Sequence, residues 1–235
     1  MEVYPEKLAR FKGIYGYWCK VSFPLNGKRF IGYVPSQLLA MVNIRENNIN
    51  YLVLVDEYKN NRLTCSLKII DHFQLIAEHK FEPVTQDVYY PVEKDTTAAF
   101  VSAYIDLELF NNKGLEGIDR IARVSTSVGA CGVWYGSNIF LLAQNKLIHS
   151  MMEEGIVDGG VYNYGYAHLF PEDSLGQKGI VLRNTWHYES AEGDTFADTW
   201  HTQVKLQWEN LTFKKLDSTY SSKRVNIMEQ QTESP

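Results

Sequence analysis

The sequence predicts a mainly β protein, built as antiparallel sheets or a sandwich, with a small hairpin module at its N-terminal end. Aromatic residues make up 13% of the 235 residues, and their broad side chains cover a pleated sheet surface well. Apolar and polar residues alternate in several short segments, as between Leu63 and Ile70. Such a period of two is typical of a strand that is buried on one face.

The strand pattern divides the chain into four predicted parts. The hairpin module covers residues 1–43, a β-meander covers 44–85, and a larger antiparallel β domain covers 86–217. Residues 218–235 are polar and lack periodicity, which predicts a disordered tail. The main internal boundary is placed in the turn-rich segment from Pro83 to Lys94.

Three segments carry more specific expectations. Residues Glu2 to Arg10 favour one helical turn or a loop that leads into the first strand. The segment Phe100 to Phe110, which reads FVSAYIDLELF, predicts a single strand. Leu147 to Glu154 favours either a short helix or an irregular edge strand.

The N-terminal module is predicted from one hairpin signal. Residues Tyr17 to Phe23 alternate as a strand, and Arg29 to Val34 form the return strand. Between them lies Asn26-Gly27, a pair that strongly favours a two-residue hairpin turn because both residues tolerate a positive φ. Pro35, Ser36 and Gln37 then predict a turn.

This stretch resembles the C-terminal half of a bacterial Src-homology-type barrel, a small domain common in cell-envelope proteins. The residues that carry the resemblance are Gly16, Trp18, Val21, Gly27, Gly32, Tyr33, Val34, Leu38 and Leu39. The resemblance implies a barrel-like module that contacts peptidoglycan or stabilises an envelope assembly. The first two strands of such a barrel have no counterpart before Tyr15, so the barrel is expected to be incomplete. The alternative is an ordinary hairpin packed on the main sheet.

Charge and hydropathy exclude two classes of partner. The net charge is −5, and no basic stripe of the kind that neutralises phosphates is present, so nucleic acid is not an expected partner. No run of about 18 apolar residues predicts a transmembrane helix. The first residues contain no apolar signal-peptide core. We therefore expect a cytoplasmic protein, or a periplasmic or envelope protein whose leader has been removed.

No catalytic or cofactor motif is found at its required spacing, so we expect a non-enzyme without a cofactor. Cys19, Cys65 and Cys131 are far apart, and the simplest interpretation is three buried thiols that act as small hydrophobic residues. Cys131 lies in the glycine-rich bend GACGVWYG, which is the best place for a nucleophile. A cysteine hydrolase that uses Cys131 with a histidine is therefore an alternative.

The last hairpin contains two further candidates for a site. If it turns at Gly193-Asp194, His187 lies opposite His201, and the two imidazoles can bind a metal or form a pH-sensitive contact. The alternative is that the two histidines only lie on a solvent-exposed face of the hairpin. We assign no metal site to them. Calcium at the carboxylates of Glu192, Asp194 and Asp198 is a further possibility, with polar turn chemistry as its alternative.

The candidate partner-binding residues are aromatic. Tyr162, Tyr164 and Tyr166 recur at a spacing of two among glycines, and Trp134 and Tyr135 lie between Gly132 and Gly136. On a strand the three tyrosines share one face, whereas on a loop they resemble the tyrosine and glycine mixture of binding loops. The alternative is that these aromatic side chains only cover one face of a sheet and have no partner.

The second half of the chain also resembles bacterial β-rich immunity and inhibitor proteins in its short strands and aromatic turns. The resemblance implies a protein partner, such as a toxin or a wall-degrading enzyme, and an acidic protein suits a basic partner. We therefore expect a non-catalytic, protein-binding immunity or inhibitor protein. The alternatives are a peptidoglycan-contacting envelope module and the Cys131 hydrolase. The sequence does not predict the oligomeric state.

Overall fold

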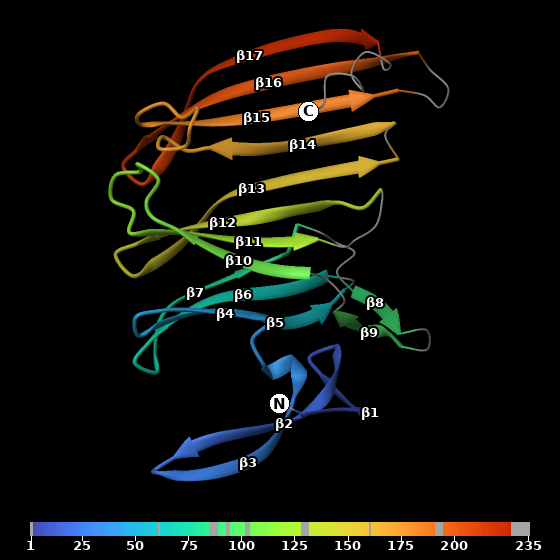
Figure 1. The fold of residues 1–235 in the computed structure, drawn as a ribbon, viewed down its shortest axis with the longest axis vertical. Helices are drawn as coiled ribbons and strands as arrows, with labels where there is room; N and C mark the ends of the chain where they lie inside the picture. The colour runs from blue at the N-terminus through green and yellow to red at the C-terminus, as the bar shows by residue number, and fades with distance from the viewer. Residues whose placement is uncertain are drawn as a thin grey trace.

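The computed structural model describes residues 2–60, 62–84, 89–92, 95–101, 104–127, 132–159, 161–190 and 195–226. Within these ranges the chain forms three β-sheets and one short 3-10 helix, η1 (Ser36–Leu38). The mainly β fold is thus confirmed. Figure 1 shows the sheets arranged along the long axis, with the β2–β3 hairpin at one end and β17 at the other. In the described part of the chain, no helix is long and apolar enough to cross a bilayer.

The N-terminal sheet has five strands in the order β1-β2-β9-β8, with β3 also paired to β2. Its strands are β1 (Glu2–Phe11), β2 (Ile14–Leu25), β3 (Lys28–Pro35), β8 (Tyr89–Val92) and β9 (Asp95–Val101). The predicted hairpin is confirmed, because Asn26 and Gly27 have φ values of 52° and 73° and join β2 to β3. The helical turn or loop expected for Glu2 to Arg10 is wrong, because this segment is strand β1, antiparallel to β2.

The start predicted for the larger β domain, at residue 86, also needs correction. Strands β8 and β9 lie within residues 86–217, yet they belong to the N-terminal sheet. The join is a short parallel pairing in which Ile14 and Tyr15 of β2 lie beside Ala99 and Phe100 of β9. The single strand predicted from Phe100 to Phe110 is therefore two strands in two different sheets.

The second sheet is a four-stranded antiparallel meander. Its strands are β4 (Val42–Glu46), β5 (Ile49–Lys59), β6 (Arg62–Asp71) and β7 (Gln74–Phe81). The alternation predicted for β6 is confirmed, because Leu63, Cys65, Leu67 and Ile69 are each 3% exposed or less. These side chains lie in the main core cluster.

The third sheet is an eight-stranded antiparallel meander in which each strand pairs with its neighbours in sequence. Its strands are β10 (Tyr104–Phe110), β11 (Arg120–Ser127), β12 (Tyr135–Ala143), β13 (Lys146–Asp158), β14 (Tyr162–Leu169), β15 (Ile180–Glu189), β16 (Phe196–Glu209) and β17 (Thr212–Asn226). The helix expected for Leu147 to Glu154 is wrong, because this segment lies in β13 and pairs with β12. The alternative of an irregular edge strand fits better, since the register shifts between Met151 and His149 and pairing with β14 begins only at Glu154.

The predicted disordered tail is wrong for residues 218–226. They form the second half of β17 and pair in register with β16. This strand lies at the edge of the sheet and is exposed along most of its length, so it needs no apolar alternation to form. The rest of the predicted tail, residues 227–235, lies outside the described residues.

The main core lies between the four-stranded sheet and β10–β13 of the eight-stranded sheet, which gives a two-layer sandwich. Phe140 of β12 is fully buried there, and its ring contacts those of Phe81, His79 and His149. A second cluster covers the opposite face, where Ile139 packs beneath the segment between β10 and β11. We call these two sides of the eight-stranded sheet the Phe140 face and the Ile139 face.

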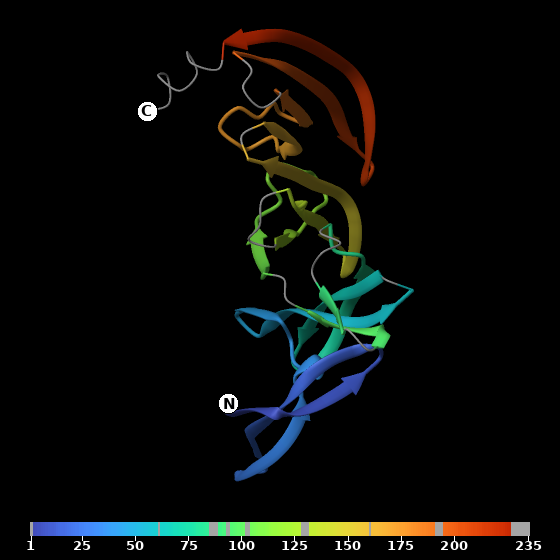
Figure 2. The same ribbon diagram turned by 90° about the vertical axis from the view of Figure 1, so that its right-hand side faces the viewer.

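The covering layer does not reach the far strands. Figures 1 and 2 show β14–β17 lying beyond the four-stranded sheet along the long axis of the molecule. Part of this outer region is buried in the second cluster, which includes Val181 and packs against Leu206, Trp208 and Phe213. Elsewhere both faces carry partly exposed side chains, including several large aromatic residues.

Candidate functional site

The three tyrosines singled out in the sequence lie on a strand. Tyr162, Tyr164 and Tyr166 belong to β14, and side chains two residues apart on a strand point to the same face. Tyr166 lies opposite Glu154 of β13, which in turn lies opposite Gly136 of β12. Gly136 and Phe140 share a side of β12, so the three tyrosines lie on the Phe140 face.

Two of these tyrosines form a continuous ring cluster with other aromatic side chains. Trp134 meets Tyr164 edge to face, with the ring centroids 5.8 Å apart. His187 contacts both Tyr164 and Tyr162, at 6.1 and 5.1 Å, and stacks on Trp200 at 4.5 Å. We call Trp134, Tyr162, Tyr164, His187 and Trp200 the aromatic cluster. It crosses β14, β15 and β16 and is partly open to solvent, with Trp134 38% exposed.

Carboxylates surround this cluster on the same face. The strand register places four of them there, and we call them the acidic rim: Glu154, Asp158, Glu189 and Asp198. Burial raises the pKa of Tyr164, and the nearby charge of Glu154 raises it further. The pKa of Tyr166 is raised by the same two causes in the same order. Two arginines on the same face offset part of this charge: Arg183 lies 6.0 Å from the Tyr166 ring, and Arg224 lies opposite Asp198.

Tyr135 does not belong with the other four candidate residues. It lies opposite Gly155 on the Ile139 face, and its ring covers that glycine. The five residues proposed from the sequence thus divide between two sides of the sheet. Trp134 and Tyr135 are neighbours in sequence and equally exposed, at 38% and 39%, but they face opposite directions.

The pairing predicted for the last hairpin is wrong by one residue. His187 lies opposite Trp200, and His201 lies opposite Trp186. Because side chains alternate, this single step places the two histidines on opposite faces of the sheet, where they cannot share a metal. His187 instead has Glu189 Oε2 3.8 Å from its Nε2.

The other sites proposed from the sequence are only partly described. Cys131, Glu192 and Asp194 lie outside the described residues. Cys19 and Cys65 are buried free thiols, as predicted, and burial with the nearby Asp56 charge raises the pKa of Cys65 to about 12. Within the described residues, no group of three or more histidine, cysteine or acidic side chains is placed to hold a metal ion.

A buried polar group near β13 and β14 was not anticipated from the sequence. Glu153 Oε1 accepts a hydrogen bond from the backbone N–H of His168 at 2.8 Å, and Glu153 Oε2 lies 3.2 Å from a guanidinium nitrogen of Arg123. Burial alone would raise the pKa of Glu153, but the hydrogen bonding with His168 and the Arg123 charge lower it. The charges of Glu153 and Arg123 neutralise each other. We therefore assign these two residues, with His168, a structural role in joining β11, β13 and β14.

Sequence reasoning missed His187 and Trp200 as members of the aromatic cluster. Both lie in segments that the sequence predicts as strands, but placing their rings on one face required the correct register of β15 and β16. Comparisons of the chain with protein-family models, with curated proteins and with solved structures found no match.

Proposed function

We propose that this protein binds another protein without catalysing a reaction, and that the aromatic cluster with its acidic rim is the contact surface. The single observation that supports this most is the interlocked set of Trp, Tyr and His rings on an uncovered part of the sheet. Tryptophan and tyrosine are the residues that most often dominate the binding energy of protein interfaces.

The packing of the cluster favours recognition because its rings are already held in place. His187 stacks on Trp200 with an interplanar angle of 20°, and Tyr162 and Tyr164 both abut the imidazole. A side chain that is ordered before binding loses less conformational entropy on association. A rigid aromatic centre inside a polar rim is the usual anatomy of a protein interface.

The acidic rim indicates the chemistry of the partner. Four carboxylates border the cluster, and complementary charge accelerates association and selects among partners. We infer a basic protein, such as a bacterial toxin or a wall-degrading enzyme, which this chain would neutralise as an immunity or inhibitor protein. The resemblance of the N-terminal hairpin to envelope barrels supports an encounter in the cell envelope.

Two neighbouring residues provide a matched test. The immobilised protein is used to capture proteins from a bacterial extract, and the captured protein is then purified and titrated against wild type, Trp134→Ala and Tyr135→Ala by calorimetry. We expect a basic protein that binds at a 1:1 ratio, with affinity lowered at least about tenfold by Trp134→Ala and unchanged by Tyr135→Ala. Equal binding by wild type and Trp134→Ala would contradict the proposal.

A further inference from the structure

The Ile139 face carries aromatic rings that lie flat on the sheet. A Cβ built on Gly155 would lie 2.7 Å from Tyr135 Cζ, and one built on Gly165 would lie 2.5 Å from Trp186 Cζ2. Each ring therefore occupies the space of a missing side chain and rests against the backbone, an arrangement known to stabilise glycine in strands. One surface of each ring is covered by the sheet, and the other points away from it.

The two rings form one platform because their glycines are paired. Gly155 of β13 lies opposite Gly165 of β14, so the rings of Tyr135 and Trp186 lie over adjacent strands. The indole is fixed in orientation, since its Nε1 donates a hydrogen bond to Asn163 Oδ1 at 3.1 Å. Tyr135 is 39% exposed. This is a rigid and flat aromatic surface that is independent of the aromatic cluster on the other face.

The platform continues into a groove across β15, β16 and β17. The register places three residue pairs side by side on the Ile139 face: Trp186 and Tyr188, Thr199 and His201, and Ser221 and Lys223. They line a cavity of about 380 Å³ together with His187, Trp200 and Ser222, which lie between the members of each pair on the same strands. Cavities of this size accommodate small-molecule ligands. The groove has an aromatic wall on β15 and hydrogen-bonding side chains on β16 and β17.

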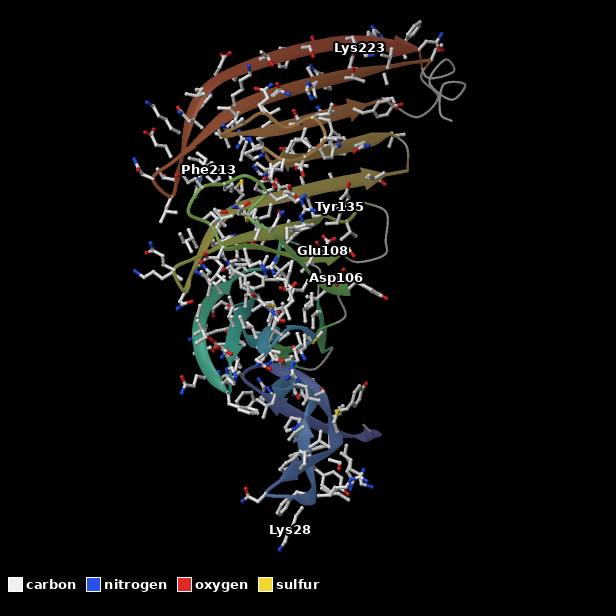
Figure 3. The ribbon with its side chains drawn as sticks, turned by 60° about the vertical axis from the view of Figure 1, so that its left-hand side comes forward. Lys28, Asp106, Glu108, Tyr135, Phe213 and Lys223 are labelled. Carbon is white, nitrogen blue, oxygen red and sulfur yellow. The ribbon has the colours of Figure 1, made fainter. Side chains whose placement is uncertain are left out.

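The charge of the groove is positive at one end. Among its described lining residues, Lys223 is the only lysine or arginine, and none is a carboxylate. The acidic residues of this region, Glu189 and Asp198, pair with each other on the opposite face, and Asp198 pairs there with Arg224. Figure 3 shows Tyr135 and Lys223 toward the same side of the eight-stranded sheet, with Tyr135 in the interior strand β12 and Lys223 in the edge strand β17. A ligand that lies along this surface would therefore contact the rings of Tyr135 and Trp186 over the inner strands and Lys223 at the edge strand β17.

We propose that the Ile139 face binds an acidic oligosaccharide, with sugar rings stacked on Tyr135 and Trp186 and a carboxylate held by Lys223. A pyranose has an apolar C–H surface that suits a flat aromatic ring and hydroxyl groups that suit Thr199, His201 and Ser221. Single-stranded nucleic acid also stacks on aromatic side chains, but its binding needs a cationic track along the phosphates. One lysine in an acidic protein does not provide such a track.

The test is a calorimetric titration, with an oligogalacturonate as the acidic ligand and a neutral maltooligosaccharide of equal length as its control. We expect saturable binding of the oligogalacturonate and at least about tenfold weaker binding of the neutral sugar, because a charge-assisted hydrogen bond would be missing. Lys223→Gln should weaken binding of the acidic ligand about tenfold and reduce its dependence on salt.

Three further variants locate the site. Trp186→Ala and Tyr135→Ala should each weaken binding of the oligogalacturonate about tenfold, and circular dichroism checks their fold. Trp134→Ala, on the opposite face, should leave it unchanged. No saturation by the acidic ligand, equal binding of both sugars, or equal losses in Trp134→Ala and Trp186→Ala would overturn the proposal. Trp134→Ala should weaken only protein binding, and Tyr135→Ala should weaken only saccharide binding. One proposal can therefore fail while the other holds.

Discussion

Truncation of Phe140 should remove a large part of the stability of the fold. The side chain is fully buried between the two layers, and its ring centroid lies 5.1 Å from Phe81, 5.0 Å from His149 and 5.6 Å from His79. Replacement of a buried phenylalanine by alanine costs about 3–5 kcal/mol, depending on how far the site can collapse. Phe140 lies in an interior strand paired on both sides, which limits collapse. We therefore expect a loss of about 4 kcal/mol.

The measurement is urea unfolding followed by circular dichroism, with Phe73→Ala as a matched control. Phe73 follows the end of β6 and is fully exposed, so its truncation should leave the unfolding free energy unchanged. The stability of a typical domain is about 5–15 kcal/mol, so the two variants should differ clearly in their urea midpoints. A loss below about 1.5 kcal/mol in Phe140→Ala, or equal losses in both variants, would refute the two-layer packing described above.

Two further predictions concern His149, in the same interface, and Gly136, where β12 and β13 approach closely. Burial, together with the neighbouring His79, lowers the pKa of His149 below 6.5, so the unfolded chain takes up this proton at a higher pH than the folded protein. The free energy of unfolding should therefore fall as the pH drops below 6.5. Urea titrations at pH 7.5 and 5.5 should show a smaller fall for His149→Leu than for the wild type. A Cβ on Gly136 would collide with the backbone carbonyl of Glu153, so Gly136→Ala should cost about 1–3 kcal/mol. Thermal melts should show that loss and little change in Gly32→Ala, where the nearest atom lies 3.9 Å away; a stable Gly136→Ala would contradict the close strand approach.

The parts of the fold that follow from local chemistry were predictable from the sequence. Asn26-Gly27 identified the first hairpin because two consecutive positive φ values restrict the choice of residues. The alternation of β6 was equally direct, since one of its faces lies in the core. The common face of Tyr162, Tyr164 and Tyr166 followed from their spacing once β14 proved to be a strand.

The remaining features depend on which strands pair with each other. The pattern of apolar residues predicts which side chains are buried, but it does not predict the strand or sheet against which they pack. The segment Phe100 to Phe110 has one continuous apolar pattern although it changes sheet within it. Residues 218–226 of β17 are exposed along most of their length, so their sequence does not differ from that of a disordered tail.

The last hairpin shows how sensitive the site was to register. A shift of one residue in the assumed pairing moved His201 to the face opposite His187. The same shift concealed that Trp200 is the partner of His187, and that Trp186 belongs to the Ile139 face.

The unbroken sequence order of the eight-stranded meander has a consequence for how the molecule reaches its native state. Each strand from β10 to β17 needs only the preceding strand as a template, so chain closure is local and can advance as successive hairpins. The join between β2 and β9 is different, because it brings together segments about eighty residues apart. We therefore expect the large meander to form early in refolding, and the parallel contact that completes the N-terminal sheet to form last.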